Sequence, residues 1–466
     1  MVHTGSMIDY SALLQPDLGQ AARSIRLIAK ADLDDWLASQ PGPVRVLAEA
    51  HQFDAAPGSV LILPGTGGDD WSVLAGASAA DGPWALAGLC SRLPAGTYRI
   101  EGGTPGQGAL GWLLSHYRYE RYRKDGEPVP QRVLLTSEPA DIAETVRQAE
   151  ATAWVRDLVN TPAADMGPAM IEHEAERLAK AFGASLTVTR GDGLESGYPL
   201  IHAVGRAADR DYAPRLIELE WGDVNSPRIA VIGKGVSFDS GGLDIKPASG
   251  MRLMKKDMGG AAHALALARL IMGAGLPVRL HVLVPAVENS ISGNAMRPGD
   301  IIRSRKGLTV EIDNTDAEGR LILADALARC GENAPELILD FATLTGAARV
   351  ALGPELPALF ANQAELGRTF HQSGDAVGDP VWELPLWAGY DDMLKSDIAD
   401  LVNSGEGGMA GAVTAALFLQ RFVPEGAAWA HLDTFAWQSG AKPGRPKGGE
   451  ALGLRAAWAL LKSRYR

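Results

Sequence analysis

Cysteine is scarce in this sequence. Among 466 residues there are two, Cys90 and Cys330, and they lie far apart in the chain. Two cysteines cannot supply a disulfide framework or a cysteine-based zinc site. We therefore expect a protein of a reducing compartment, with a cytoplasmic location.

Long hydrophobic runs are also lacking. No stretch approaches the roughly 20 apolar residues that a helix needs to cross a bilayer. The N-terminus has no basic region followed by an apolar stretch and a cleavage site, so no secretory signal is expected. Residues 1–6 precede a second methionine at position 7 and are interpreted as a remnant of cloning.

Positive charge is in deficit, with 44 Lys and Arg against 56 Asp and Glu and a formal net charge of -12. This balance disfavours nucleic acid and anionic membranes as partners. Hydrophobic residues make up 46% and charged residues 21%, as in a folded globular protein. Because the chain is too long for one ordinary core, we expect two domains of unequal size.

The first third of the chain predicts a small N-terminal α/β domain over residues 7–138. Short apolar strands at 60–63 and 132–135 flank helical patterns such as residues 111–117. This part has no cluster of acids or histidines, so a catalytic role is not expected there. A long helix from about 140 to 159 follows, and it should end before Pro162 because proline disfavours helix in the preceding residue. Residues 139–165 are thus interpreted as a connecting helix and linker.

Residues 166–466 predict a larger C-terminal α/β catalytic domain. Strands and helices alternate along it; the strands are expected at 228–232, 278–284, 309–312 and 336–339, and the helices at 259–272 and 320–329. Repeated β-α-β units indicate a central mixed, largely parallel sheet flanked by helices. Ligands bind beyond the carboxyl ends of the strands in such sheets, so the chemistry is expected there.

Three segments of this domain combine acids with basic residues. They are residues 233–247 (GKGVSFDSGGLDIKP), 256–260 (KDMGG) and 313–321 (DNTDAEGRL). Together they would bring four carboxylates to one edge of the sheet, with two lysines and an arginine among them: Asp239, Asp257, Asp316 and Glu318, with Lys234, Lys246 and Arg320.

Four gathered carboxylates repel one another and lose hydration, so they need compensating positive charge. Two divalent ions about 3.5–4 Å apart would supply it and would lower the pKa of a bound water from 15.7 towards roughly 7, which suits amide hydrolysis. A histidine-based zinc site is less favoured. The chain has no His-Glu-x-x-His pair, and of its nine histidines only His263 lies near these segments, inside a predicted helix.

Each acid also has a simpler interpretation. Asp257 could cap its helix, Asp316 and Glu318 could interact with the macrodipole of the next helix, and Asp239 could belong to an ordinary turn. Taken singly, these roles are commoner than metal binding. The three segments fall at the same edge and each carries a lysine or arginine, and this combination favours a metal site.

These segments resemble the M17 leucyl aminopeptidase family (cytosol aminopeptidase). Residues 314–321, NTDAEGRL, match the family's signature octapeptide letter for letter. Other matches in order and spacing extend the resemblance from about residue 155 to 435; they are 160–162, 233–235, 238–242, 245–247, 257–260, 292–293, 297–300, 343–346 and 394–396. The N-terminal third is similar only in its general layout.

The resemblance implies two divalent ions, Zn²⁺, Mn²⁺ or Mg²⁺, and a role for each residue of the cluster. The ligands of the tighter site would be Lys234, Asp239, Asp257 and Glu318, and those of the more exchangeable site Asp239, Asp316 and Glu318. Lys246 would stabilise the oxyanion. Arg320 would hold a bicarbonate ion, although its simpler role is to neutralise the acids.

The resemblance also implies the substrate and the assembly. The family's substrate-binding positions correspond to Met254, Asn314, Ala317, Thr343, Leu344 and Gly346. Because methionine is apolar and adaptable, a preference for Leu or Met at the peptide N-terminus is expected, although Met254 and Thr343 could equally be core residues. The expected protein is an aminopeptidase acting on peptides as a homohexamer.

Two segments depart from the family pattern. Residues 405–408, GEGG, lack an arginine that family members often carry, and residues 434–437, TFAW, replace a stretch of small residues. Both lie near the expected approach of the substrate. Two other functions stay open: a phosphoester hydrolase with the same metals, disfavoured because no Gly-x-x-x-x-Gly-Lys-Ser/Thr loop is present, and a regulatory DNA-binding role, disfavoured by the negative charge.

Overall fold

A computed structural model of the chain describes residues 8–65, 67, 70–77, 82–124 and 130–466. The interpretation of residues 1–6 as a remnant lies outside them. The chain divides into two compact units: Met1–Ala153 with Gly440–Lys447, and Trp154–Ser439 with Gly448–Arg466. A short C-terminal segment is therefore grouped with the smaller unit. The domain limits expected from the sequence, after residues 138 and 165, stay predictions.

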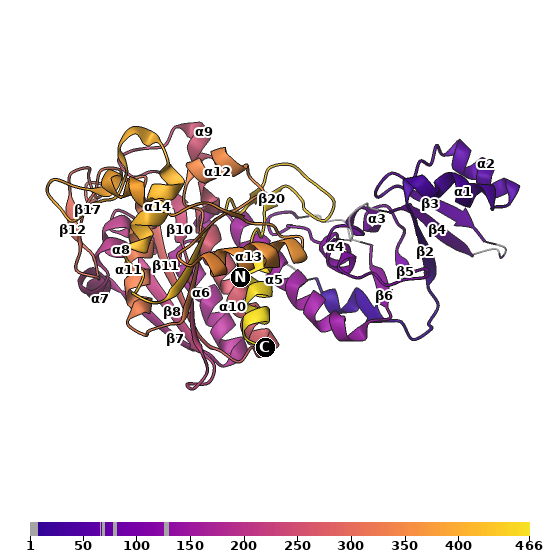
Figure 1. Cartoon of the computed structure of the whole chain (residues 1–466), viewed down its shortest axis with the longest axis horizontal. Helices are drawn as coiled ribbons and strands as arrows, with labels where there is room; N and C mark the ends of the chain where they lie inside the picture. Colours follow the sequence, from indigo (N-terminus) through magenta and orange to yellow (C-terminus); the bar gives the residue numbers. More distant parts are fainter. Residues whose placement is uncertain (1–7, 66, 68–69, 78–81, 125–129) are drawn as a thin grey trace. The chain divides into compact units, whose positions relative to one another are not determined.

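The smaller unit is an α/β structure with one sheet in the order β1-β6-β5-β2-β4-β3 among the described residues (Figure 1). Its strands are β1 (Leu14–Pro16), β2 (Arg23–Ile28), β3 (Val60–Pro64), β4 (Trp71–Gly76), β5 (Gly96–Ile100) and β6 (Arg132–Thr136). All neighbours are parallel except β3, which is antiparallel to β4. Its helices are α1 (Leu33–Ala38), α2 (Gly42–Ala50), α3 (Ala87–Cys90) and α4 (Gly108–Leu114). The core packs around Tyr98, Trp112 and Leu134.

The predicted long helix is confirmed as α5 (Ile142–Asn160). Ala149, Val155 and Leu158 on it are buried. The helix ends two residues before Pro162, as expected from the conformational restriction that proline places on the residue before it.

The larger unit has a mixed sheet in the order β16-β15-β18-β14-β9-β11-β8-β7, with β10 paired to β11 outside this path. Its strands are β7 (Ser185–Arg190), β8 (Arg215–Trp221), β9 (Arg228–Gly233), β10 (Gly235–Asp239), β11 (Arg279–Asn289), β14 (Leu337–Ala342), β15 (Ala358–Ala361), β16 (Trp382–Glu383) and β18 (Ala428–Asp433). The central strands β18, β14, β9 and β11 are parallel, which confirms the predicted mixed, largely parallel sheet.

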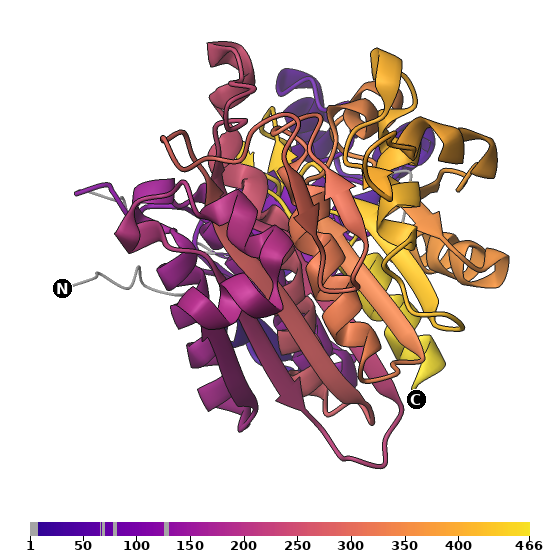
Figure 2. The same cartoon turned by 90° about the vertical axis from the view of Figure 1, so that its left-hand side faces the viewer.

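Helices cover both faces of this sheet (Figure 2). Successive side chains of a strand point to opposite faces. Ala230 and Ile232 of β9 pack in one core cluster with helices α8 (Pro199–Gly205), α11 (Glu318–Gly331) and α14 (Gly411–Gln420). The alternate residues Ile229 and Val231 are equally buried, and α10 (Gly259–Ala274) packs against β9 as well. The other helices are α6 (Pro168–Phe182), α7 (Gly191–Gly197), α9 (Ala248–Met251), α12 (Gly346–Leu352), α13 (Ala364–Ala376) and α15 (Leu454–Arg464).

Two predicted elements differ from the structure. Residues 235–239, expected to be loop, form strand β10, because their backbone pairs in parallel with β11. The strand expected at 309–312 is β13 (Thr309–Glu311), and it does not join the main sheet. It is three residues long, and it pairs instead with β12 (Ile301–Arg303) and β17 (Leu401–Val402) in a separate small sheet. A further pair is formed by β19 (Trp437–Gln438) and β20 (Gly448–Gly449).

No helix in the described part of the chain combines the length and the apolar character needed to cross a membrane.

Candidate metal centre and its pocket

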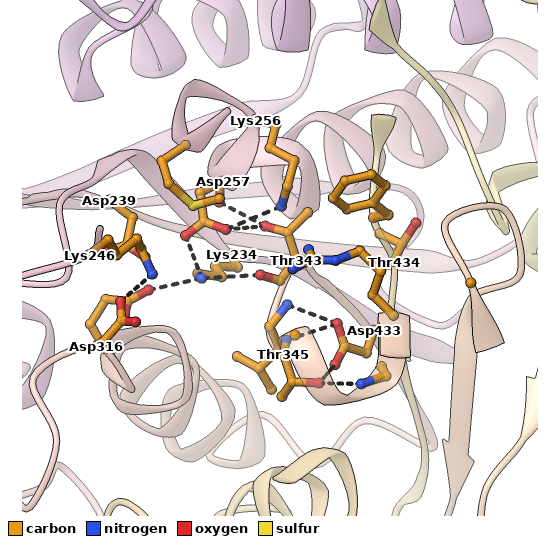
Figure 3. Close-up of a pocket in the computed structure, with 18 of the residues that line it drawn as sticks. Lys234, Asp239, Lys246, Lys256, Asp257, Asp316, Thr343, Thr345, Asp433 and Thr434 are labelled. Atoms are coloured by element: carbon orange, nitrogen blue, oxygen red, sulfur yellow. Dashed lines mark hydrogen bonds and ion pairs between the residues drawn. The ribbon is translucent and has the colours of Figure 1, made fainter. Parts of the chain in front are cut away.

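Three parallel strands deliver side chains to one pocket at their carboxyl ends (Figure 3). Lys234 directly follows β9, Thr343 directly follows β14, and Asp433 is the last residue of β18. Because these strands are parallel neighbours, their carboxyl ends meet at the same edge of the sheet. The pocket therefore lies where an open α/β sheet is expected to bind its ligand.

Three further elements complete the pocket wall. Strand β10 ends at Asp239, the short 3-10 helix η6 (Met254–Met258) carries Asp257, and α11 begins at Glu318. Gly260, at the start of α10, permits this assembly. A Cβ there would lie 2.2 Å from the carbonyl oxygen of Phe341 on β14, so only glycine lets the helix start approach the strand this closely.

The acids predicted from the sequence lie together. Asp239, Asp316 and Glu318 each offer a carboxylate oxygen, and these oxygens lie within 4.8 Å of one another. Asp257 joins them through Lys234, whose Nζ is 2.5 Å from Asp257 Oδ2 and 2.9 Å from Glu318 Oε1. All except Asp316 are almost completely buried.

Lys246 approaches the cluster from the opposite side to Asp257 (Figure 3). Its Nζ is 2.8 Å from Asp239 Oδ2 and forms an ion pair with Asp316. Burial alone would lower the pKa of Lys246, but the carboxylates of Asp239 and Glu318 outweigh it and raise that pKa. The ammonium group is thus held beside the acids while 15% of the side chain stays accessible from the pocket.

The donor set fits divalent cations. Asp257 Oδ2 and Glu318 Oε1 are buried, and both face Lys234 Nζ, at 2.5 and 2.9 Å, without a well-aligned hydrogen bond within the described part of the chain. Burial and the neighbouring Asp239 raise the pKa of Glu318 to about 8 and that of Asp316 to about 6. Gathering these carboxylates therefore opposes their ionisation, and ions of double positive charge would compensate it.

The simpler interpretations of the acids can be compared with this geometry. Neither α10 nor α11 has a side-chain hydrogen bond at its N-cap, and the cap residues are Met258 and Ala317, so Asp257 does not cap its helix. Asp239 does take part in a turn, because its Oδ1 accepts a hydrogen bond from Gly241 N at 2.9 Å. Its second oxygen, Oδ2, stays directed at Lys246.

Four of the six predicted substrate-binding residues line the pocket: Met254, Thr343, Leu344 and Gly346. Among the described residues, Asn314, Ala317 and Arg320 are not part of this lining. Asn314 Oδ1 instead accepts a hydrogen bond from Asp316 N at 2.8 Å, which orients the Asp316 loop. Arg320 is buried, donates from Nη1 to Asn403 O at 2.7 Å, and has its pKa lowered to about 10 by burial.

Reasoning from the sequence missed several pocket residues, among them Lys256, Arg349 and Asp433, whereas Phe435 belongs to the segment 434–437 that was expected near the approach of the substrate. Asp433 accepts hydrogen bonds from Leu344 N at 2.9 Å and Thr345 Oγ1 at 2.6 Å. A signal for Asp433 was present, because it directly follows a short run, Ala428–Leu432, that is apolar except for His431. Lys256 adjoins Asp257 in the same short segment, but no motif gives it a role.

Two family models match the chain. The catalytic domain of the cytosol aminopeptidase family matches residues 153–457, and the N-terminal domain of M17 aminopeptidases matches residues 24–135. A protein of Syntrophotalea carbinolica named "Probable cytosol aminopeptidase" is 43% identical over 369 residues, which cover 76% of this chain and 73% of that protein. A protein of Brucella anthropi with the same name is 37% identical over 466 residues and covers 91% of this chain and 92% of its own.

Solved structures agree with these sequence matches. The cytosol aminopeptidase from Coxiella burnetii superposes with a TM-score of 0.92 at 44% identity, covering 97% of this chain and all of that one. The bottromycin maturation enzyme BotP in complex with Mn superposes with a TM-score of 0.85 at 33% identity, covering 96% of this chain and all of that one. The chain therefore belongs to the cytosol aminopeptidase (M17) family and is an enzyme of the leucyl aminopeptidase type.

Proposed function

We propose that this chain removes the N-terminal residue of peptides by metal-assisted hydrolysis at a two-ion site. The ions would be held by Lys234, Asp239, Asp257, Asp316 and Glu318. The observation that carries this proposal is the convergence of the carboxylates of Asp239, Asp316 and Glu318 within 4.8 Å of one another, with Asp257 joined to them through Lys234. Zn²⁺, Mn²⁺ and Mg²⁺ are the candidate ions, and a relative of similar structure binds Mn.

Two ions bound here would supply a nucleophilic hydroxide at neutral pH and polarise the scissile carbonyl. A lysine can bind a metal only as the neutral amine. Burial alone would lower the pKa of Lys234, but Asp257, Glu318 and Asp239 outweigh burial and raise it. Metal binding at Lys234 must therefore displace a proton, and metal affinity should rise with pH.

Lys246 would act on the carbonyl oxygen of the peptide bond. Its ammonium group is fixed by ion pairs to Asp239 and Asp316 and remains accessible from the pocket. A positioned cation stabilises the negative charge that develops on this oxygen in the transition state. Lys246 would thus be a catalytic residue that forms its key contact as the reaction proceeds.

A bicarbonate ion at Arg320 belongs to the same proposal. Nε of Arg320 is buried and has no hydrogen-bond partner in the described part of the chain, while Nη1 donates to Asn403 O. A buried guanidinium nitrogen without an acceptor is costly, and an anion beside it would supply one. The buried Nε of Arg320, which could donate a hydrogen bond to bicarbonate, is the structural support for this part of the proposal.

The preference for N-terminal Leu or Met is the finer part of the proposal. Met254, Leu344 and Leu356 give the pocket an apolar portion that suits such side chains. The cytoplasmic location and the homohexamer implied by the family resemblance also belong here.

Replacing one ligand tests the proposal. In Asp316→Ala, hydrolysis of leucine amide should fall by more than ~100-fold, since even indirect partners of a metal ligand are worth about 10–100-fold. Asp313→Ala is the matched control, because Asp313 is an exposed acid in the same loop that does not line the pocket. Unchanged hydrolysis in Asp316→Ala, with the control also active, would refute the two-ion site.

A further inference from the structure

We infer that Lys256 makes the pocket for the N-terminal side chain a binding site for a carboxylate, so that the enzyme cleaves peptides beginning with Glu or Asp in addition to apolar residues. This inference rests on the proposed function and specifies its substrate class. It is carried by a buried ammonium group that lines the pocket and has no hydrogen-bond acceptor among the residues that the structure describes.

Lys256 is 3% exposed and lines the pocket. Its interactions within the described residues are an ion pair at 3.8 Å to Asp257 Oδ1 and a cation–π contact, with Nζ 5.0 Å from the ring centre of Phe435. An ammonium group has three N–H donors. A charge removed from water needs both a counter-charge and hydrogen bonds, and 3.8 Å is too long for a hydrogen bond.

The acids near Lys256 are committed to other partners. Asp257 Oδ1 accepts the hydroxyl of Thr343 at 2.7 Å, and its Oδ2 faces Lys234 at 2.5 Å. Asp433 accepts three hydrogen bonds from the two residues that precede α12, two from their backbone N–H groups and one from the Thr345 hydroxyl. The charge of Lys256 is therefore available to a group that enters the pocket.

A second cation lines the same pocket. Arg349 on α12 is exposed, and its guanidinium carbon lies 4.7 Å from the ring centre of Phe435. No ion pair of Arg349 is present among the described residues. Phe435 thus stands within cation–π distance of both Lys256 and Arg349. The pocket combines an aromatic surface for the methylene groups of a Glu side chain with two cations for its carboxylate.

The location of Lys256 distinguishes the N-terminal side chain from the C-terminal carboxylate of a short peptide. Lys256 adjoins Asp257, while Lys246, the expected partner of the scissile carbonyl, pairs with Asp239 and Asp316. Figure 3 shows the two lysines on different sides of Lys234 and Asp257. Met254, which is expected to contact the N-terminal side chain, lies in the same short helix η6 and lines the same pocket, so Lys256 lies within reach of that side chain.

The test compares two nearly isosteric substrates. Wild-type enzyme should cleave glutamyl p-nitroanilide with a kcat/KM at least ~10-fold above that of glutaminyl p-nitroanilide, because a buried charge-assisted contact is lost with the amide. In Lys256→Met, the ratio of the two kcat/KM values should fall to about 1. Lys255→Met is the matched control, because Lys255 donates to Asn160 O at 2.6 Å, does not line the pocket, and loses the same charge; its ratio should stay as in the wild type.

Each outcome decides between the alternatives. Equal rates for the two substrates in the wild type, or an equal fall of the ratio in both lysine variants, overturns the inference. So does faster cleavage of Leu-Gly than of leucyl-glycinamide without any Glu preference, since Lys256 would then bind the C-terminal carboxylate. Absence of leucyl p-nitroanilide cleavage would count against the proposed function itself.

A binding measurement keeps the inference testable if Lys256→Met does not fold. In calorimetry on the metal-loaded wild type, free glutamate should bind at least ~10-fold more tightly than glutamine, for the same reason of charge-assisted contact. Equal affinities for the two amino acids would contradict the inference.

Discussion

At the scale of residues, the centre is defined by opposing charges held within a few ångströms. Four carboxylates converge, and two lysines enter from different sides: Lys234 reaches Asp257 and Glu318, and Lys246 reaches Asp239 and Asp316. Most of these groups are buried. Such a cluster is a poor way to stabilise a fold, because desolvation opposes every charge in it. A role in stability therefore does not account for the cluster, whereas metal binding does.

Lys246 gives a direct test of the electrostatic role. Lys246→Met should lower kcat for leucine amide by ~10²–10³-fold, the usual loss when one group that stabilises an oxyanion is removed. KM should change much less, because the contact forms mainly in the transition state. Steady-state kinetics on protein with a measured metal content check this. Unchanged kcat at full metal content would remove Lys246 from the catalytic residues.

The sequence could predict the acids and both lysines of the centre, because each stands in a short motif beside a predicted strand or helix. It placed the segment containing Phe435 near the approach of the substrate, but it could not predict that Arg349 and Lys256 face the same pocket as this ring. Residues 256, 349 and 435 come from three separate segments, and their proximity depends on how α12 and the end of β18 pack against η6. Sequence periodicity does not report such packing.

At the scale of elements, close backbone contacts determine where the proposed metal ligands lie. Gly319, the second residue of α11, is an example: a Cβ there would come within 2.5 Å of Lys234 Cε and 2.8 Å of its Nζ. Helix α11 therefore contacts the lysine side chain through a residue that has no side chain. The position of Lys234 is set by the helix as well as by β9.

Gly319→Ala should displace Lys234 and weaken metal binding by ~10–100-fold, the effect typical of disturbing the support of a metal ligand. Alanine favours helix over glycine, so a loss of helix propensity cannot be the cause. Metal titration against a competing chelator measures the effect. Gly293→Ala is the control, since a Cβ there meets open space. Equal metal affinity in the Gly319 variant and the control would show that the position of Lys234 does not depend on the absence of a side chain at residue 319.

Asp325 joins two helices and makes stability depend on pH. It lies on α11 and accepts backbone hydrogen bonds at 2.8 Å from Leu200 N, at the start of α8, and from Arg305 N. Burial raises the pKa of Asp325 to about 6, against the effect of these hydrogen bonds. A raised pKa in the folded state means that protonation favours folding. The contribution of Asp325 to the free energy of unfolding is therefore fully present below about pH 4 and is lost as the pH rises through about 6.

Asp325→Asn removes this titration. The Tm of the wild type minus the Tm of the variant should be larger near pH 5 than near pH 7.5, because the wild type loses the stabilisation from protonated Asp325 over this interval. Thermal unfolding at matched ionic strength provides the measurement. A difference that stays constant, or widens towards pH 7.5, would contradict the raised pKa.

The elements themselves were largely predictable. The strands β9 and β14 and the helices α5, α10 and α11 follow from apolar runs, helical periodicity and Gly or Pro stop signals. Strand β10 was not, because the glycine-rich stretch that contains it resembles a loop and only pairing with β11 makes it a strand. β13 was assigned to the wrong sheet, since three residues carry no information about their partner.

At the scale of the whole molecule, the sequence defines a negatively charged two-unit protein. The residues proposed to bind metal or act in catalysis all belong to the larger unit. Membership of the aminopeptidase family favours peptide hydrolysis over the phosphoester and DNA-binding alternatives that the composition alone left open. What composition cannot show is the metal requirement, because it arises from side chains contributed by three separate segments of the chain.

The central claim is metal-dependent removal of an N-terminal residue, and one measurement tests it most directly. Purified protein is stripped with a chelator, shown to remain folded, and assayed on leucine amide before and after addition of Zn²⁺, Mn²⁺ or Mg²⁺. We expect activity to disappear on stripping and to return with at least one of these ions. Full activity in the stripped protein, or no activity with any of the ions, would contradict the claim.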